Sequence, residues 1–474
     1  MSNQITAQSA LQFIPPDFNP LVQKAINFIL PFYIKNKTPL TEITAENVEI
    51  LADLYQQFEA GKIRFLLAFR HPSTLDPFVL GYLLGHLLPK VAKKQHLLLK
   101  NIPHAHFIYD RGIPLWAGEY VGWLYAKLGG IPIQRGKLDR LALKTIRDLF
   151  ANGKLPMMAA PEGGTNGHSE IISPLEPGIP QMGFWCIEDL IKNNRNEQVF
   201  IVPIGMQYHY IDEPWKSLKN LLSQLEKDCG FNSAQISSNN NDDTHANLYR
   251  RLYQLGEYLL TQMEDFYSKF YHRQELILEN RPNPDNFVDL GQRSPDDNQN
   301  FSERLNRLLD TALKVAEEYF SIQGKGSFID RCRRLEQAGW DYIYRDDLTD
   351  IDNLSALKKG LADRIAEEAD LRMWHMRLVE NFVAVTGRYI IEKPSAERFA
   401  ETVMLTWDVI TKIKGGATFP RPNLGKQRVQ VTVGNPISVS DRWEVYQSSR
   451  KNAKQCVSDL TQDLQNALES MIKG

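Results

Sequence analysis

The sequence predicts an α/β fold in which a mainly parallel sheet is flanked by helices and a large α-helical insertion interrupts the domain. Between residues 61 and 211, short apolar runs of strand length alternate with helical patterns, which is typical of a parallel sheet covered by helices. The pattern is helical over 212–424, and an alternating β pattern returns only at Arg428. We therefore expect an N-terminal helical segment (1–60), an α/β domain (61–211 with 425–474) and an α-helical insertion (212–424).

Composition narrows the class of protein. The 474 residues carry a net charge of −2, and no basic run is interleaved with aromatic residues, so nucleic acid is not an expected partner. The cysteines are too scattered for a zinc site or a disulfide framework, so we expect reduced thiols and no metal. There is no secretory signal pattern and no run of about 18 apolar residues. We expect a cytoplasmic protein that is soluble or peripherally associated with a membrane surface. The cysteines are Cys186, Cys229, Cys332 and Cys456.

Residues 13–36 predict a short apolar helix that ends at Pro31 and is followed by aromatic residues and lysines. Such a segment suits a membrane interface, where aromatic rings and long basic side chains are favoured. A helix packed on the protein core is the alternative, and the sequence does not decide between them. A polar helix over Ala45–Ala60 follows.

The α/β region begins with a buried strand over Ile63–Phe69 and an apolar helix over Phe78–Leu88. Glycines after two of the later helical patterns are in place to end them. Further strands are expected at Leu97–Lys100, Phe107–Tyr109, Ile131–Arg135, Leu155–Ala160 and Gln198–Tyr208, and further helices at Leu115–Leu128, Leu138–Ala151 and Pro180–Ile191.

The insertion combines long helical patterns with two polar stretches expected to be loops, Ser233–Thr244 and Arg281–Asn300. Ser395 is placed to cap the last helix of the insertion. A β pattern from Arg428 and a final helix over 443–472 complete the chain. The expected helices of the insertion are Leu248–Phe270, Phe301–Phe320, Leu354–Ile390 and Ala396–Ile413.

His71 and Asp76 lie at the turn between the first α/β strand and the helix after it. Asp76 can orient the histidine through one ring nitrogen while the other accepts a proton from a hydroxyl, which describes a general-base dyad. The alternative is a capped helix with no catalytic role. Arg135 and Glu162 also follow strands, and ligands of parallel sheets bind beyond the carboxyl ends of the strands.

Several short motifs, in the correct order, resemble those of the glycerolipid acyltransferases, the family of 1-acylglycerol-3-phosphate acyltransferases. The resemblance covers about residues 60–210 and 428–440 and leaves the insertion outside. The motifs are His71-Pro-Ser73-Thr-Leu-Asp76, similar to His-x-Ser-x-x-Asp; Gly130-Ile-Pro-Ile-Gln-Arg135; Ala160-Pro161-Glu162-Gly163-Gly164-Thr165, similar to Phe-Pro-Glu-Gly-Thr-Arg; Val202-Pro203-Ile204, similar to Val-Pro-Val; Gly178; and Gly434-Asn-Pro436-Ile.

The resemblance implies direct transfer of a fatty acyl group from a thioester to a glycerolipid hydroxyl, with His71 as base and Asp76 holding its ring. It further implies a substrate site in which Glu162 binds the hydroxyl region of the acceptor and Arg135 its phosphate. Gly163 and Gly164 leave backbone N–H groups for the developing oxyanion, and Thr165 belongs to the same site. A surface role for Arg135 and a simple turn at the glycines are the alternatives.

We expect acyl-CoA or an acylated carrier protein (acyl-ACP) as donor, no cofactor beyond that thioester, and a lysophospholipid acceptor at a membrane surface. The favoured reaction converts 1-acyl-sn-glycerol-3-phosphate to phosphatidic acid. The alternatives are another lysolipid, glycerol 3-phosphate, or a catalytically poor lipid-binding protein whose insertion recruits partners. Three departures from the family pattern leave the acceptor open: an extra glycine followed by Asn166 where an arginine is usual, Pro177 for a lysine, and Arg70 for an asparagine.

Overall fold

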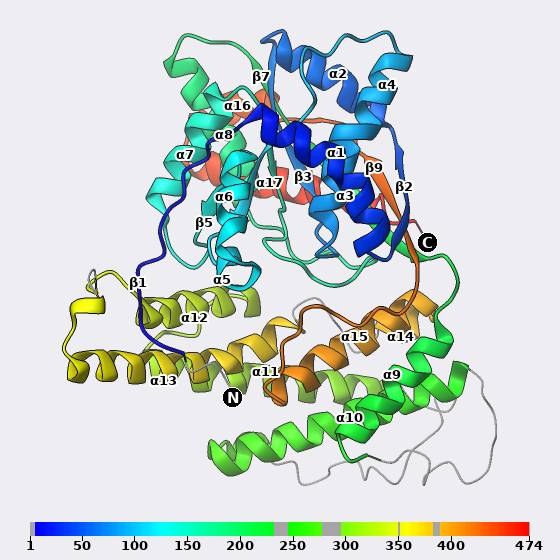
Figure 1. The fold of residues 1–474 in the computed structure, drawn as a ribbon, viewed down its shortest axis with the longest axis vertical. Coiled ribbons are helices and arrows are strands. Elements are labelled where there is room, and N and C mark those ends of the chain that lie inside the picture. The colour runs from blue at the N-terminus through cyan, green and yellow to red at the C-terminus, as the bar shows by residue number, and fades with distance from the viewer. Residues whose placement is uncertain (1–4, 232–244, 277–294, 349–350, 383–388, 474) are drawn as a thin grey trace. The chain divides into compact units, whose positions relative to one another are not determined.

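The chain divides into two units, each compact by itself, in a computed structural model (Figure 1). One unit consists of Met1–Ala10 with Asp212–Gly425, and the other of Leu11–Ile211 with Lys426–Gly474. The predicted N-terminal segment 1–60 is thus divided between the units, and most of it belongs to the α/β unit. The structure describes residues 5–231, 245–276, 295–348, 351–382 and 389–473.

Strand β3 (Ile63–Phe69) is the centre of the α/β unit, and all seven of its residues are buried. A continuous apolar run of this length is what a parallel strand covered on both faces requires. It pairs in parallel with β7 (Gln198–Tyr210) along its full length, from Ile63 opposite Gln198 to Phe69 opposite Ile204. On its other side it pairs in parallel with β6 (Met157–Ala159).

The sheet of the α/β unit has the strand order β2-β9-β7-β3-β6-β4-β5, and β10 pairs with β7. The five strands from β7 to β5 run parallel, whereas β9 is antiparallel to β7 and β2 is parallel to β9. The α/β fold class with a mainly parallel sheet is therefore confirmed. The remaining strands are β2 (Leu40–Glu46), β4 (His106–Asp110), β5 (Ile131–Ile133), β9 (Gln427–Val433) and β10 (Ile437–Ser438).

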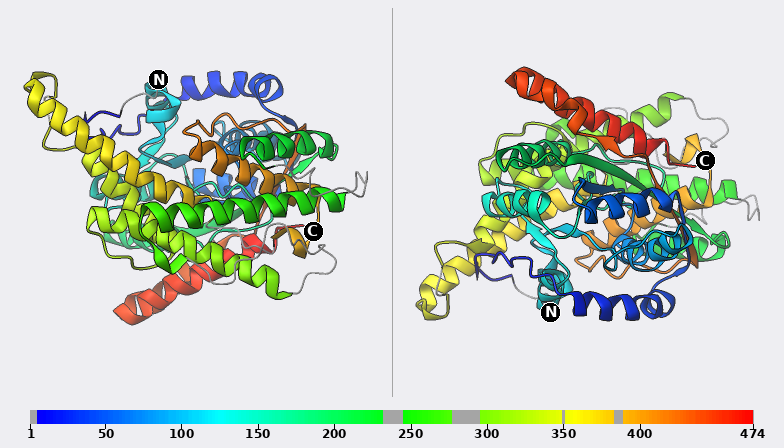
Figure 2. Two further views of the ribbon diagram at one scale, coloured as in Figure 1. Left: turned by 90° about the horizontal axis from the view of Figure 1, so that it is seen from below. Right: turned by 90° about the horizontal axis from the view of Figure 1, so that it is seen from above.

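Helices cover both faces of this sheet, and each face has its own apolar core. One core contains α1 to α4 and the other α7, α8 and α17, the last of which is drawn in red in Figures 1 and 2. The helices of the unit are α1 (Pro20–Lys37), α2 (Val48–Glu59), α3 (Asp76–Tyr82), a π-helical turn (Leu83–Leu87), α4 (Leu88–Lys94), α5 (Ile113–Ala117), α6 (Glu119–Lys127), α7 (Arg140–Asn152), α8 (Gly178–Lys192), α16 (Trp443–Ser448) and α17 (Arg450–Glu469).

Pro31 does not end its helix, contrary to the prediction, because α1 continues to Lys37. A proline inside a helix removes the N–H that would bond to the carbonyl four residues earlier, here that of Asn27. His86 Nε2 lies 2.9 Å from the Asn27 carbonyl oxygen and satisfies it. This contact with His86, in the π-helical turn, compensates for the hydrogen bond that the proline removes from α1.

Three other local predictions differ from the structure. The N-terminal segment is not purely helical, since β2 lies in it as an edge strand with an alternating burial pattern. No strand occurs over Leu97–Lys100, where Leu98 is 87% exposed and the Lys100 N–H donates to Glu59. The predicted helix 115–128 is divided into α5 and α6 at Gly118, whose φ of 102° is accessible mainly to glycine.

The other unit consists mainly of helices with a core of their own. A two-stranded parallel ribbon of β1 (Gln8–Ser9) and β8 (Tyr344–Arg345) interrupts the helical pattern expected over 212–424. Ser395 caps α15 as predicted, by accepting from the Arg398 N–H. The helices are α9 (Trp215–Asp228), α10 (His245–Phe270), α11 (Pro295–Phe320), α12 (Phe328–Ile343), α13 (Ala356–Glu380), α14 (Tyr389–Glu392) and α15 (Ala396–Ile413), with 3₁₀ turns at Gln274–Leu276 and Ile351–Asn353.

The two polar loops expected in this unit fall largely outside the described residues. Ser233–Thr244 does so completely, and so does most of Arg281–Asn300. The last residues of the second stretch form the first turns of α11, which begins at Pro295. Helix α13 ends at Glu380, earlier than predicted, and residues 383–388 are not described.

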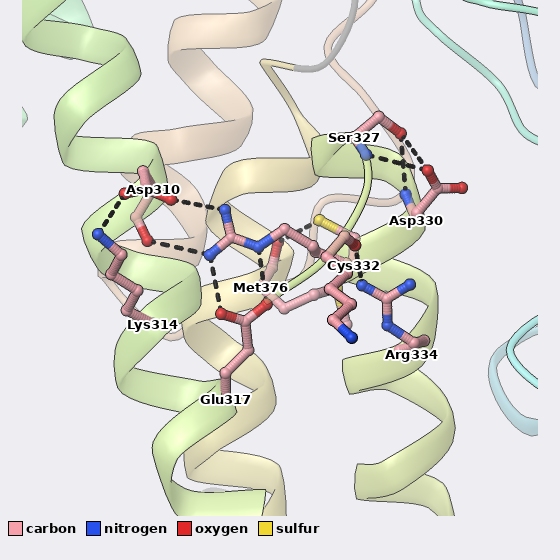
Figure 3. Close-up of polar contacts among 10 residues, drawn as sticks. Asp310, Lys314, Glu317, Ser327, Asp330, Cys332, Arg334 and Met376 are labelled. Atoms are coloured by element: carbon pink, nitrogen blue, oxygen red, sulfur yellow. Dashed lines mark hydrogen bonds and ion pairs between the residues drawn. The ribbon is translucent and has the colours of Figure 1, made fainter. Parts of the chain in front are cut away.

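The buried arginine Arg331 of α12 is paired with two carboxylates of α11, Asp310 and Glu317, which are labelled in Figure 3. Arg331 donates from Nε and Nη2 to the two carboxylate oxygens of Glu317, at 2.7 and 2.8 Å, and from Nη1 to Asp310 at 2.6 Å. Arg331 and Glu317 are both buried. These hydrogen bonds, with the charges of both carboxylates, raise the pKa of Arg331 above its ordinary value despite the opposing effect of burial. A capping box of Ser327 and Asp330 begins α12 beside this pair.

We expect Arg331→Ala to lower the free energy of unfolding of the helical unit by about 3–5 kcal/mol, because it leaves the Glu317 carboxylate buried and unpaired. Arg364→Ala is the matched control, since Arg364 is 70% exposed and pairs with Glu367 on the same helix. Its loss should cost only about 0.2–0.5 kcal/mol. Urea unfolding followed by circular dichroism measures both. Equal effects of the two variants would show that Arg331 is not a buried structural cation.

Candidate active site

His71, Arg135 and Glu162 come together because their strands are parallel neighbours in one sheet. His71 follows β3, Glu162 follows β6, and Arg135 follows β5. The carboxyl ends of parallel strands meet at one edge of a sheet, so the loops after them face a common space. The sequence placed these residues at strand ends, and the strand order brings the ends together.

The His71 ring is held by a buried carboxylate. His71 Nδ1 lies 2.8 Å from Asp76 Oδ2, and the Asp76 side chain is fully buried at the first residue of α3. The Ser73 N–H donates to the same oxygen at 2.9 Å, and the Tyr208 hydroxyl donates to Asp76 Oδ1. Burial, reinforced by the charge of Asp76, raises the pKa of Tyr208 well above its ordinary value of 10.0, which keeps this hydroxyl protonated.

These contacts determine which nitrogen of His71 accepts a proton. An ionised carboxylate can only accept hydrogen bonds, so the contact with Asp76 assigns the N–H of His71 to Nδ1. The other nitrogen, Nε2, then presents a lone pair. Thr165 Oγ1 lies 2.9 Å from it, which is the geometry of a hydroxyl about to donate a proton to a base.

Glu162 is buried, and its two oxygens accept from groups inside the protein. Oε1 accepts from the His71 N–H at 3.0 Å, and Oε2 accepts from the Ser173 N–H at 2.9 Å and from Asn166 Nδ2 at 2.7 Å. Burial raises the pKa of Glu162, and the positive charge of Arg70 partly opposes that rise. Glu162 thus stabilises the loop after β6 and holds it to the His71 backbone. Its contact with substrate stays a prediction.

The backbone N–H groups of the two glycines after Glu162 differ in their hydrogen bonding. Gly163 has a φ of 70°, and its N–H donates to the Ala160 carbonyl at 3.1 Å, so this amide closes a turn. The N–H groups of Gly164 and Thr165 have no hydrogen-bond partner among the residues that the structure describes. The Gly163 amide is thus occupied by a bond within the turn, and the binding of an oxyanion by the amides of this loop stays a prediction.

Arg135 lies beside this turn and is only partly exposed. Its Nε donates to Asp110 Oδ2 at 2.7 Å, and its Nη1 donates to the Gly163 carbonyl. A Cβ added at Gly164 would lie 3.2 Å from Nη1, so a side chain there would crowd the arginine. The predicted phosphate ligand is thus paired with a carboxylate.

Both unusual residues, Asn166 and Arg70, turn inward. Asn166 Nδ2 bonds to Glu162 and, at 2.8 Å, to the Ile171 carbonyl, so this amide does not stand where a cation would meet a phosphate. Arg70 is buried and donates to the carbonyls of His168, Ser169 and Ile171. The two residues fold the loop after β6 against the end of β3.

Four residues make contacts in the site although no role was predicted for them from the sequence: Ser73, Tyr208, Asp110 and Arg70. Tyr208 lies four residues beyond the Val202-Pro203-Ile204 motif on β7, and nothing in its neighbours distinguishes it from a core aromatic. Asp110 ends β4, and its position at a strand end was an available signal. No group of three or more His, Cys, Asp or Glu side chains in the described ranges is arranged to hold a metal ion.

Comparison with known families agrees with this geometry. Residues 42–207 match the sequence model of the acyltransferase family, a stretch that begins in β2 and ends in β7. The match contains every residue of the candidate site except Tyr208. No curated protein and no solved structure matches the chain. The matched stretch carries the parallel strands and the loops at their carboxyl ends, so the part of the α/β unit that holds the candidate site is similar to the acyltransferase family.

Proposed function

We propose that the enzyme transfers a fatty acyl group from acyl-CoA or acyl-ACP to the free hydroxyl of a glycerolipid. The observation that carries the proposal is the relay of Asp76, His71 and a hydroxyl, with distances of 2.8 and 2.9 Å at the two ring nitrogens. A histidine oriented in this way can take a proton from a hydroxyl as its oxygen attacks a carbonyl. The intact pair favours an enzyme over a lipid-binding protein without activity.

The residues account for each charge that develops. As the acceptor oxygen attacks the thioester carbonyl, its proton passes to His71 Nε2, and Asp76 stabilises the imidazolium. We assign the oxyanion to the N–H groups of Gly164 and Thr165, because these amides have no partner among the described residues and backbone amides are common oxyanion donors. When the carbon–sulfur bond breaks, His71 returns the proton to the thiolate.

The favoured acceptor is 1-acyl-sn-glycerol-3-phosphate, with Arg135 on its phosphate and phosphatidic acid as the product. A guanidinium suits a phosphate because it can donate to two oxygens at once. The pairing of Arg135 with Asp110, together with the inward Asn166, favours a second candidate, a lysolipid that carries no phosphate. The donor and the acyl chain length are open in both cases.

The substrates are lipids, and one side of α1 suits a membrane surface. Leu21, Phe28 and Phe32 lie on one face of this helix and are 63–75% exposed. Trp123 on α6 is 56% exposed, and α6 is tied to the chain before α1 by a bond from the Asn19 N–H to the Lys127 carbonyl. None of the helices in the described residues is long and apolar enough to cross a bilayer. We propose peripheral binding through this face of α1.

His71→Ala should lower transfer by about 10²–10⁴-fold, which is the usual contribution of a general base. Asp76→Asn should also be severe, since an amide cannot stabilise the imidazolium. His96→Asn is the control, because His96 is exposed in the same unit and has a positive φ that asparagine tolerates. Product is measured by mass spectrometry with lysolipid and acyl thioester. Retention of more than roughly a tenth of the activity by His71→Ala would refute the base assignment.

Arg135→Ala distinguishes the two acceptor classes. If the acceptor carries a phosphate, loss of a charged hydrogen bond worth about 1.5–3 kcal/mol should lower kcat/KM for the acceptor by about 10–150-fold and leave the donor KM almost unchanged. The assay compares lysophosphatidate with monoacylglycerol, and Arg140→Ala, an exposed arginine of α7, is the control. Equal losses on both acceptors would mean that Arg135 supports the loop and does not bind phosphate.

The double variant Phe28→Ser/Phe32→Ser should bind vesicles of phosphatidylglycerol and phosphatidylcholine at least about tenfold more weakly, since each buried aromatic side chain contributes about 1.5–3 kcal/mol. Leu357→Ser/Leu361→Ser removes two equally exposed apolar residues from α13 and should have little effect. Co-sedimentation measures the binding, and the melting temperature checks the fold. Unchanged sedimentation of the Phe28 and Phe32 variant would exclude this face as the membrane contact.

A further inference from the structure

We propose that the exposed face of α13 binds a second copy of this chain, so that two α13 helices pack antiparallel in a dimer. The inference concerns the helical unit and does not rest on the proposed acyl transfer. Helix α13, labelled in Figure 1, packs one face on the core of its own unit and carries an apolar stripe on the opposite face. An exposed apolar stripe rimmed by polar residues is typical of a protein interaction surface.

The buried and the exposed apolar residues of α13 lie on different faces of the helix. The exposed face carries Leu357, Leu361 and Leu371, whose exposed fractions are 74%, 59% and 58%. Residues 356–361 are all exposed, so more than one turn of the helix is open to solvent. The opposite face is buried in the core of the helical unit and consists of Ala362, Ala366, Ala369 and Met373.

The exposed face has the residue spacing of a coiled-coil seam. Its positions from Leu357 to Leu371 recur at alternating intervals of four and three residues, which aligns them along one side of the helix. Arg364 and Glu368 occupy the two central positions, with side chains that are 70% and 44% exposed. The seam is therefore apolar at both ends and carries one charge of each sign in the middle.

The two central charges identify the occupant as a second copy of the same seam. In an antiparallel pair with a two-fold axis at the level of Ala366, Arg364 faces the partner's Glu368 and Leu361 faces the partner's Leu371. The two-fold axis repeats both contacts. A parallel pair in register would instead place each charge opposite its like, which is unfavourable. Charged positions in a seam set its register and orientation, so this seam is complementary to itself as an antiparallel pair.

The residues beside the seam are compatible with this pairing. Ile365 is exposed and lies next to the two-fold axis, so it meets the same residue of the partner. Glu367 also meets its own copy there, and each of these carboxylates is paired with Arg364 of its own helix. Glu368 lies 3.6 Å from Arg372 within the helix. Such exposed ion pairs are weak, so they permit the contacts with the partner.

The dimer should be weak and concentration-dependent. A contact through one helix of each chain is small beside the roughly 1,200–2,000 Å² that stable interfaces bury, so we expect a dissociation constant in the micromolar range. Association adds to stability by mass action. The urea and vesicle experiments described above therefore use protein concentrations below this constant, so that their control variants on α13 do not report on the dimer.

Sedimentation velocity of the full chain over a range of protein concentrations tests the proposal. Arg364→Glu and Glu368→Arg each place like charges opposite one another, and each should weaken the dimer at least about tenfold. The double variant Arg364→Glu/Glu368→Arg exchanges the two charges and should restore it. Lys359→Glu is the control, since it makes the same charge change at an exposed position of α13 outside the seam. The melting temperature of each variant checks the fold.

A mixture of the two single variants gives the sharpest test. Arg364→Glu has two acidic central residues in the seam and Glu368→Arg has two basic ones. An equimolar mixture should therefore form a heterodimer, although neither variant pairs with itself. Neither a membrane nor the α/β unit as the occupant of this face predicts that recovery.

Three results would overturn the proposal. A wild type that is monomeric at every concentration shows that the exposed face has another occupant. A dimer that both single variants leave unchanged has its interface elsewhere. Loss of the dimer in the single variants, without recovery in the double variant or in the mixture, means that Arg364 and Glu368 do not pair across it. The transfer assay with His71→Ala is independent of all three.

Discussion

The buried carboxylate of Asp76 is the constraint on which the site depends. An ionised carboxylate without partners inside a protein costs several kcal/mol, so its environment must supply donors. Here the donors come from the end of β3, the turn before α3 and the far end of β7. Strand β3 is paired with β7 along the full length of β3. The register of this pairing sets the position of Tyr208, farther along β7, and so brings its hydroxyl to Asp76. The fold of the sheet and the orientation of the His71 ring are therefore coupled.

The loop after β6 is organised by a second set of buried polar groups. Glu162 ties the loop to the His71 backbone, and Arg70 holds three of its carbonyls from the other side. Removing either partner would strand buried hydrogen-bonding groups, each at a cost of about 1–3 kcal/mol. The loop is consequently stiff where it passes beneath the site, and its exposed polar tip is Thr165. Arg70 and Asn166, which differ from the family pattern, therefore stabilise this loop and do not add a charge to the substrate site.

The helical unit has an independent core and an independent set of buried ion pairs. Arg304, like Arg331, is almost fully buried and donates to carboxylates of a neighbouring helix, those of Glu257 and Glu264 on α10. With its own apolar cluster and satisfied charges, such a unit can occupy the connection between β7 and β9 without contributing strands to the sheet. The two ends of that connection are adjacent, since the backbone N–H of Ile211 donates to the backbone carbonyl of Lys426 at 2.9 Å.

The sequence alone determined the α/β class, the central strand Ile63–Phe69 to the residue, most helices of both units and the positions of His71, Arg135 and Glu162 at strand ends. It did so because apolar periodicity and capping residues are local signals that survive without neighbours. It did not predict β2, because this edge strand alternates only weakly between buried and exposed residues. It ended α1 too early, because the carbonyl left without a donor by Pro31 is satisfied by His86, a histidine distant in the sequence. Tertiary structure alone decided that Tyr208 and Ser73 hold Asp76, that Asp110 pairs with Arg135, and that the Thr165 hydroxyl meets His71. Those contacts join residues that lie up to 132 positions apart, and strand order and register, which no local pattern encodes, bring them within hydrogen-bonding distance.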